Sequence, residues 1–155
     1  MNSGGPDGEI GASMRYLSQR FTAPNRVCMA VLTDVATEEL GHLEMVSTIV
    51  HQLTANLTVE EIENQGFADY YVDHAVGIWP QSAGGIPFNS CEFQSKGDPI
   101  TDMFESMAAE QKARSTYDNI LRVVRDIPEI ADPIRFLRAR EVVHFQRFGE
   151  ALQSL

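Results

Sequence analysis

The sequence predicts an all-α fold, a bundle of four helices with a long crossover between the second and the third. Apolar residues recur three and four positions apart over four segments, which is the spacing that gathers side chains on one face of a helix. Proline, aspartate and asparagine stand between these segments, where helices begin and end. The expected helices cover residues 6–21, 25–54, 99–126 and 132–153 of one domain that spans residues 1–155.

The first two predicted helices are separated by Pro24 and Asn25. The inward face of the helix over residues 25–54 is unusually regular, with positions that alternate four and three residues apart. These positions are Cys28, Leu32, Val35, Glu39, His42, Val46, Ile49 and Leu53. Two polar residues therefore occupy consecutive positions of an apolar seam, and burying them without partners would cost several kcal/mol. A bound metal would compensate for that cost.

The last two predicted helices show the same anomaly. In the helix over residues 99–126, Glu110 falls on the apolar seam. The final helix is expected to start at Asp132 and Pro133, a favourable N-cap and N1 pair, and its seam contains Glu141 and His144. Residues of the metal-binding type thus occupy seam positions that are normally leucine in a helical bundle.

The connection between the second and third helices has a different composition. Residues 58–65 suggest a short capped helix, and residues 77–97 are rich in glycine and proline, as expected of a loop. Two further histidines, His51 and His74, lie outside the seams, and we expect them at the surface or in packing rather than at a metal.

Composition bounds the function. A chain of 155 residues that is 43% hydrophobic and 22% charged is typical of one soluble domain. The net charge of −10 disfavours nucleic acid and anionic membranes as partners. We find no membrane-span stretch and no signal sequence, so we expect a cytoplasmic protein. Cys28 and Cys91 form no Cys-x-x-Cys motif, which argues against a zinc or thiol redox site.

Two Glu-x-x-His tetrads carry the chemistry, Glu39 to His42 and Glu141 to His144. Residues i and i+3 share one face of a helix, so each tetrad can offer a carboxylate oxygen and an imidazole nitrogen to one point. This is half of the ligand plan of ferritin-like di-iron and di-manganese carboxylate proteins.

The other half of the plan is a single glutamate on each of two further helices. Glu9 precedes His42 by 33 positions and Glu110 precedes His144 by 34. Each of these glutamates also begins the pattern Glu-x-x-Ala-x-x-x-Tyr, which ends at Tyr16 or Tyr117. The agreement indicates two related halves, each serving mainly one metal of a pair. Carboxylate and imidazole suit manganese and iron alike, so the residues leave the metal open.

Four segments carry a family resemblance. They are GGPDGEIGASMRYLSQRF, LTDVATEELGHLEMVSTIVHQL, AAEQKARSTYDNIL and LRAREVVHFQRFGEAL, and they resemble the manganese catalase family, especially its short spore-coat members. The resemblance implies a site of two manganese ions that disproportionates hydrogen peroxide to water and dioxygen. It also implies a homo-oligomer, located in the cytoplasm or the spore coat.

The resemblance also implies a role for each site residue. Glu9 and His42 would be terminal ligands of one manganese, Glu110 and His144 those of the other, and Glu39 the bridging carboxylate. Symmetry between the tetrads would make Glu141 a further ligand, whereas the resemblance makes it the catalytic proton-transferring group, and we adopt the second interpretation. Tyr16 would hydrogen-bond Glu9, with Tyr117 its counterpart on Glu110.

The chain departs from the family pattern at three places. It is shortened at both ends, with Glu9 close to the start, so we expect a short first helix that holds Glu9 less firmly. Ala109 stands where some family members have arginine, and we expect a more open site. Two other functions share the ligand plan: a di-iron ferritin-like oxidase or peroxidase, and a structural spore-coat protein whose metal site is vestigial.

Overall fold

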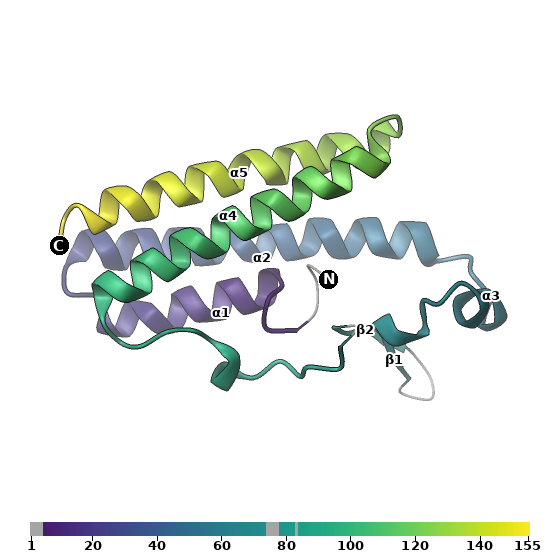
Figure 1. Cartoon of the computed structure of the whole chain (residues 1–155), viewed down its shortest axis with the longest axis horizontal. Helices are drawn as coiled ribbons and strands as arrows, with labels where there is room; N and C mark the ends of the chain where they lie inside the picture. Colours follow the sequence, from purple (N-terminus) through teal and green to yellow (C-terminus); the bar gives the residue numbers. More distant parts are fainter. Residues whose placement is uncertain (1–4, 74–77, 83) are drawn as a thin grey trace. The chain divides into compact units, whose positions relative to one another are not determined.

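A computed structural model describes residues 5–73, 78–82 and 84–155 (Figure 1). Its α-helices are α1 (Glu9–Gln19), α2 (Arg26–Thr54), α3 (Val59–Asn64), α4 (Pro99–Val124) and α5 (Pro128–Leu152). Short 3-10 turns are η1 (Arg20–Thr22), η2 (Ala68–Tyr70) and η3 (Ser90–Glu92), and the strands are β1 (Tyr71–Asp73) and β2 (Ile78–Pro80). All four predicted long helices are present, and the predicted short helix corresponds to α3.

The chain forms two compact units. The first contains residues 1–13 and 39–93, and the second contains residues 14–38 and 94–155. Helices α1 and α2 each run from one unit into the other. The proposed ligands are therefore divided between the units.

In the first unit, the start of α1 is fixed by a close approach of the backbone. A Cβ built on Gly11 would lie 2.0 Å from the carbonyl oxygen of Pro6, so only glycine fits where the chain folds back over the first turn. Helix α1 therefore begins at Glu9, later than the predicted residue 6, and η1 continues it beyond Gln19.

The crossover in the first unit contains a capped helix and a strand pair. Thr58 accepts a hydrogen bond from the backbone N–H of Glu61, whose carboxylate accepts one from the Thr58 N–H. This confirms the predicted capping box. The loop predicted from residue 77 is partly wrong, because β2 pairs antiparallel with β1 and Tyr71 lies opposite Pro80. Strands of three residues are too short for an alternating pattern to reveal them. His74 lies outside the described residues.

In the second unit, α4 and α5 run side by side, joined by a short link (Figure 1). The predicted start of α5 at Asp132 is wrong: the helix begins at Pro128, and Pro133 lies inside it. The carbonyl oxygen of Ile127 accepts hydrogen bonds from the backbone N–H groups of Ile130 and Ala131, so the chain is helical before Asp132. Both prolines satisfy the rule that proline is favoured in the first turn of a helix. In the structure the helix starts at the first of them, Pro128.

Within the described residues, no helix combines the length and the apolar character needed to cross a bilayer.

Candidate metal centre

All eight residues predicted for the site are buried in the structure. The six proposed ligands and proton carriers lie on four helices: Glu9 on α1, Glu39 and His42 on α2, Glu110 on α4, and Glu141 and His144 on α5. Each is at most 5% exposed, and Tyr16 and Tyr117 are fully buried. Burying so many ionisable groups is costly unless charge and hydrogen bonding compensate. The burial fits residues that surround cations.

The donors of the first unit lie around His42. Its Nδ1 is 2.7 Å from Oε2 of Glu39 and 3.9 Å from Oε2 of Glu9. Glu39 and His42 are one helical turn apart on α2, and Glu9 is held in the first turn of α1. The structure therefore places one imidazole nitrogen and two carboxylates together, as the spacing of these residues predicts.

The donors of the second unit lie around His144. Its Nδ1 is 3.3 Å from Oε2 of Glu110. The other oxygen of Glu110 accepts a hydrogen bond from the hydroxyl of Tyr16. The ring of Tyr16 packs edge-on against Phe148, with 4.9 Å between ring centroids. The phenol is therefore fixed by packing as well as by its hydrogen bond.

The hydroxyl of Tyr16 donates to Glu110, which lies on another helix, α4. The hydrogen bond to Glu9 that the family resemblance implies stays a prediction. Tyr117 is fully buried on α4, seven residues after Glu110.

Sequence analysis missed two residues that contact Tyr16 and His144. Arg15 places a guanidinium nitrogen 3.2 Å from the Tyr16 hydroxyl and its central carbon 5.0 Å from the centre of the Tyr16 ring. Glu38 places Oε2 3.3 Å from Nε2 of His144. No local motif marks either residue, although Glu38 directly precedes the ligand candidate Glu39.

Glu38 is itself held by Arg140 of α5. Arg140 Nε is 2.5 Å from Oε1 of Glu38, and its NH2 group is 3.1 Å from Oε2. Burial alone would raise the pKa of Glu38, but hydrogen bonds from Arg140 and His144 and the charges of both outweigh it and lower that pKa. The same hydrogen bond raises the pKa of Arg140. Glu38 is therefore an anion beside His144.

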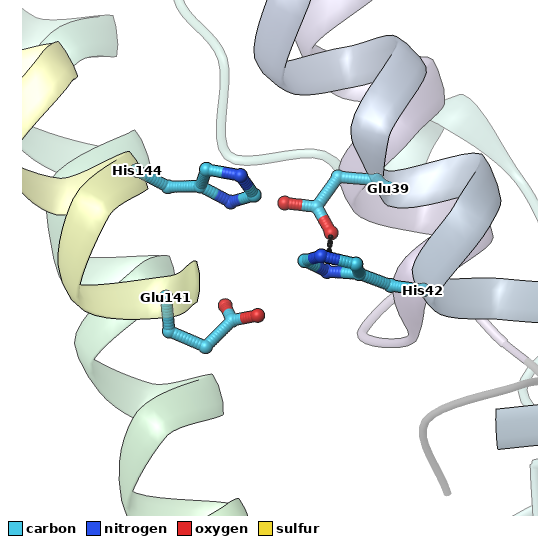
Figure 2. A group of neighbouring side chains, drawn as sticks. All are labelled: Glu39, His42, Glu141 and His144. Atoms are coloured by element: carbon cyan, nitrogen blue, oxygen red, sulfur yellow. Dashed lines mark ion pairs between the residues drawn. The ribbon is translucent and has the colours of Figure 1, made fainter. Parts of the chain in front are cut away.

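Figure 2 shows the side chains of both tetrads, with a dashed line for the ion pair between His42 and Glu39. Glu39, His42, Glu141 and His144 each offer one ligand atom, a carboxylate oxygen or an imidazole nitrogen. Two carboxylates and two imidazoles are a donor set that fits manganese, iron or zinc. Glu9 and Glu110 each approach the histidine of their own unit, Glu9 that of the first and Glu110 that of the second. His51 is exposed near the end of α2, as expected.

Comparison with known proteins assigns this chain to a family. A family model described as "Manganese containing catalase" matches residues 2–155. Protein CotJC of Bacillus subtilis is 47% identical over 98% of this chain and 79% of its own. A probable manganese catalase of Clostridium acetobutylicum is 30% identical over 98% of this chain and 67% of its own.

A solved structure extends the likeness to the fold. The crystal structure of KatB, a manganese catalase from Anabaena, is 30% identical to this chain and superposes with a TM-score of 0.82. The match covers 99% of this chain and 68% of the KatB chain, so this chain is shorter than its catalase relatives. The all-α, ferritin-like fold class is confirmed. This chain is a member of the manganese-containing catalase family.

Proposed function

We propose that this protein is a manganese catalase, which converts two molecules of hydrogen peroxide to two of water and one of dioxygen. The observation that carries the proposal is the burial of both tetrads, Glu39 with His42 and Glu141 with His144. These tetrads occur in a chain that matches the manganese-containing catalase family over residues 2–155. When bound, a pair of manganese ions would supply the two-electron oxidation and reduction of peroxide.

In this proposal the ligands are shared between the two halves of the chain. Glu9 and His42 would hold one ion, Glu110 and His144 would hold the other, and Glu39 would be a ligand to both. The contacts of His42 with Glu9 and Glu39 and of His144 with Glu110 support this division. The hydrogen bond from Tyr16 leaves one Glu110 oxygen, Oε2, to face His144, so Tyr16 orients the carboxylate for ligation.

Glu141 is the proposed proton carrier. Two protons leave a peroxide molecule as it becomes dioxygen, and two protons are needed as a second molecule becomes two waters. A carboxylate that is 1% exposed can accept and return such protons one at a time. The glutamate thereby links the two half-reactions.

We propose further that residues 1–155 form one dimetal-carboxylate domain that assembles into a homo-oligomer. Hydrogen peroxide is the small-molecule partner, and the excess of acidic residues disfavours nucleic acid and anionic membranes. The proposed location is the cytoplasm or, by the resemblance to short spore-coat members, the spore coat.

Dioxygen release from hydrogen peroxide tests the proposal directly. The protein is reconstituted separately with Mn(II) and Fe(II), assayed for bound metal, and followed with an oxygen electrode. We expect one O₂ for every two peroxides consumed by the manganese form, and buffer with the same free metal is the control. Manganese-loaded protein that consumes no peroxide would contradict the proposal.

A di-iron oxidase or peroxidase is the second candidate function, because the same oxygen and nitrogen donors suit iron. It predicts that the iron form consumes peroxide without releasing O₂, or oxidises Fe(II). A structural spore-coat role predicts bound metal with no turnover by either form. The three functions therefore give different results in one assay.

A further inference from the structure

We propose that Glu38, held by Arg140, is a positioning residue that selects the metal-binding nitrogen of His144. In this tautomer the Nε2–H group donates to the Glu38 carboxylate, and the lone pair of Nδ1 is directed toward Glu110. The inference rests on the proposed metal site for its consequence, but its geometry is independent of the reaction.

The two ring nitrogens of His144 face different carboxylates. Nε2 is 3.3 Å from Oε2 of Glu38, and Nδ1 is 3.3 Å from Oε2 of Glu110. A neutral imidazole carries one proton, so one nitrogen donates and the other presents a lone pair. The partner on the far side of a metal-binding histidine generally decides which nitrogen is which.

The second histidine indicates which nitrogen faces the metal. In His42 it is again Nδ1 that contacts carboxylates of the proposed ligand set, at 2.7 Å from Glu39 and 3.9 Å from Glu9. If both histidines bind through the same atom, Nε2 of His144 is the nitrogen that must carry the proton. Glu38 places a carboxylate oxygen on that side.

Arg140 makes Glu38 a fixed acceptor rather than a mobile surface side chain. It contacts both carboxylate oxygens, at 2.5 and 3.1 Å, in the two-pronged arrangement that restricts a carboxylate most strongly. Both side chains are less than one third exposed. The pair is therefore partly shielded and lies beside an imidazole that has no exposed surface.

A neighbouring ion pair provides a matched control. Arg147 of α5 contacts Asp34 of α2, and the pairs Arg140–Glu38 and Arg147–Asp34 both join the same two helices. Asp34 is 64% exposed, and the contacts of its carboxylate in the described structure do not include a histidine. Loss of Asp34 removes one interhelical ion pair without touching the proposed metal site.

The experiment compares Glu38→Ala, Glu38→Gln and Asp34→Asn by two measurements. The first is ¹⁵N nuclear magnetic resonance of the histidine rings in metal-free protein, with His144 assigned by its loss in His144→Gln. The second is Mn(II) affinity, measured by competition with a chelator. We expect His144 to be protonated on Nε2 in the wild type and to become a mixture of tautomers in Glu38→Ala.

We expect Mn(II) affinity to fall by about 10 to 100-fold in Glu38→Ala, as for other partners of metal-binding histidines. Glu38→Gln keeps an acceptor oxygen, so its tautomer ratio and its Mn(II) affinity should lie between those of Glu38→Ala and the wild type. Asp34→Asn should change neither the tautomer nor the affinity. An unchanged tautomer in both Glu38 variants would overturn the inference, as would an equal loss of affinity in Asp34→Asn. Wild-type protein that binds no Mn(II) would defeat the proposed function, while the tautomer measurement would still decide the role of Glu38.

Discussion

The two Glu-x-x-His tetrads have the same spacing and the same burial, yet their surroundings differ. On α2, Nδ1 of His42 lies 2.7 Å from Glu39 of its own tetrad. On α5, the two nitrogens of His144 face Glu110 and Glu38, which belong to other helices. The spacing places a pair on one face of a helix, but the segments packed against that face determine the partners.

The difference teaches that equal motifs need not have equal roles. Glu39 lies against its own histidine, which suits a carboxylate that shares a metal with it. His144 instead has a carboxylate of another helix at each ring nitrogen. The proposed roles, ligation by Glu39 and proton transfer by Glu141, can be separated by substitution.

Replacing the two tetrad glutamates gives the largest expected effect. Glu141→Gln should keep two metals and lower O₂ release by about 10² to 10⁴-fold, because the proton carrier is lost. Glu39→Gln should lose metal as well as activity. Metal content by mass spectrometry and an oxygen electrode separate the two results, with Glu150→Gln, on the exposed side of α5, as control. Loss of metal in Glu141→Gln would restore the symmetrical interpretation in which both glutamates are ligands.

Replacing the two histidines should reduce the stabilisation that metal provides. A ligand at 100 times its dissociation constant stabilises a folded protein by about 2.7 kcal/mol, and this gain should shrink in both His42→Ala and His144→Ala. The measurement is the melting temperature with and without Mn(II), together with metal stoichiometry. The exposed His51 provides the control His51→Ala. Unchanged metal-dependent stabilisation in either seam variant would remove that histidine from the proposed ligand set.

The sequence predicted the burial of the tetrads because local periodicity is sufficient for it. Glu39 and His42 fall on an apolar stripe, and any packing that buries Leu32 and Val35 also buries them. The four long helices followed from the same periodicity. The start of α5 was missed because Pro128 and Pro133 both satisfy the rule for a first turn, and the hydrogen bonds around Ile127 decide between them.

The partners of the buried groups could not be predicted because they join distant segments. Tyr16 and Glu110 are 94 positions apart, and Glu38 and Arg140 are 102 apart. No periodic pattern specifies which of several arginines meets a given acid. Arg140 therefore resembled the other arginines of the last helix until tertiary packing placed it beside Glu38.

Removing the Tyr16 hydroxyl should destabilise the metal-free protein by an intermediate amount. Tyr16→Phe leaves the buried Glu110 carboxylate without its phenol donor, and hydrogen bonds to charged groups contribute about 1.5 to 3 kcal/mol. The check is urea unfolding against Tyr71→Phe, whose hydroxyl makes only a long 3.4 Å contact with Thr54 in a partly buried position. A smaller loss for Tyr16→Phe than for Tyr71→Phe would mean that Glu110 does not depend on this bond.

The smallest expected effect comes from an ion pair that has no histidine behind it. Asp118 on α4 contacts Arg138 at 2.9 Å and Arg114 at 2.6 Å. The hydrogen bond from Arg138 is the main cause that lowers the pKa of Asp118, opposed by desolvation and assisted by the charges of nearby arginines. Because this pKa is lower in the folded state, the contribution to stability is present above the unfolded value near 3.8 and disappears as the pH falls through the folded value.

Asp118→Asn should therefore shift the urea midpoint slightly at neutral pH, and the shift should vanish as the pH falls through the lowered pKa of Asp118. High salt should reduce the shift. Metal affinity should not change. The variant thus measures what an ion pair with an arginine of α5 contributes to stability when it supports only the fold. The effect of losing Glu38 can be judged against this value. A loss of Mn(II) affinity equal to that of Glu38→Ala would show that the contrast between Arg138 and its near neighbour Arg140 has no functional meaning.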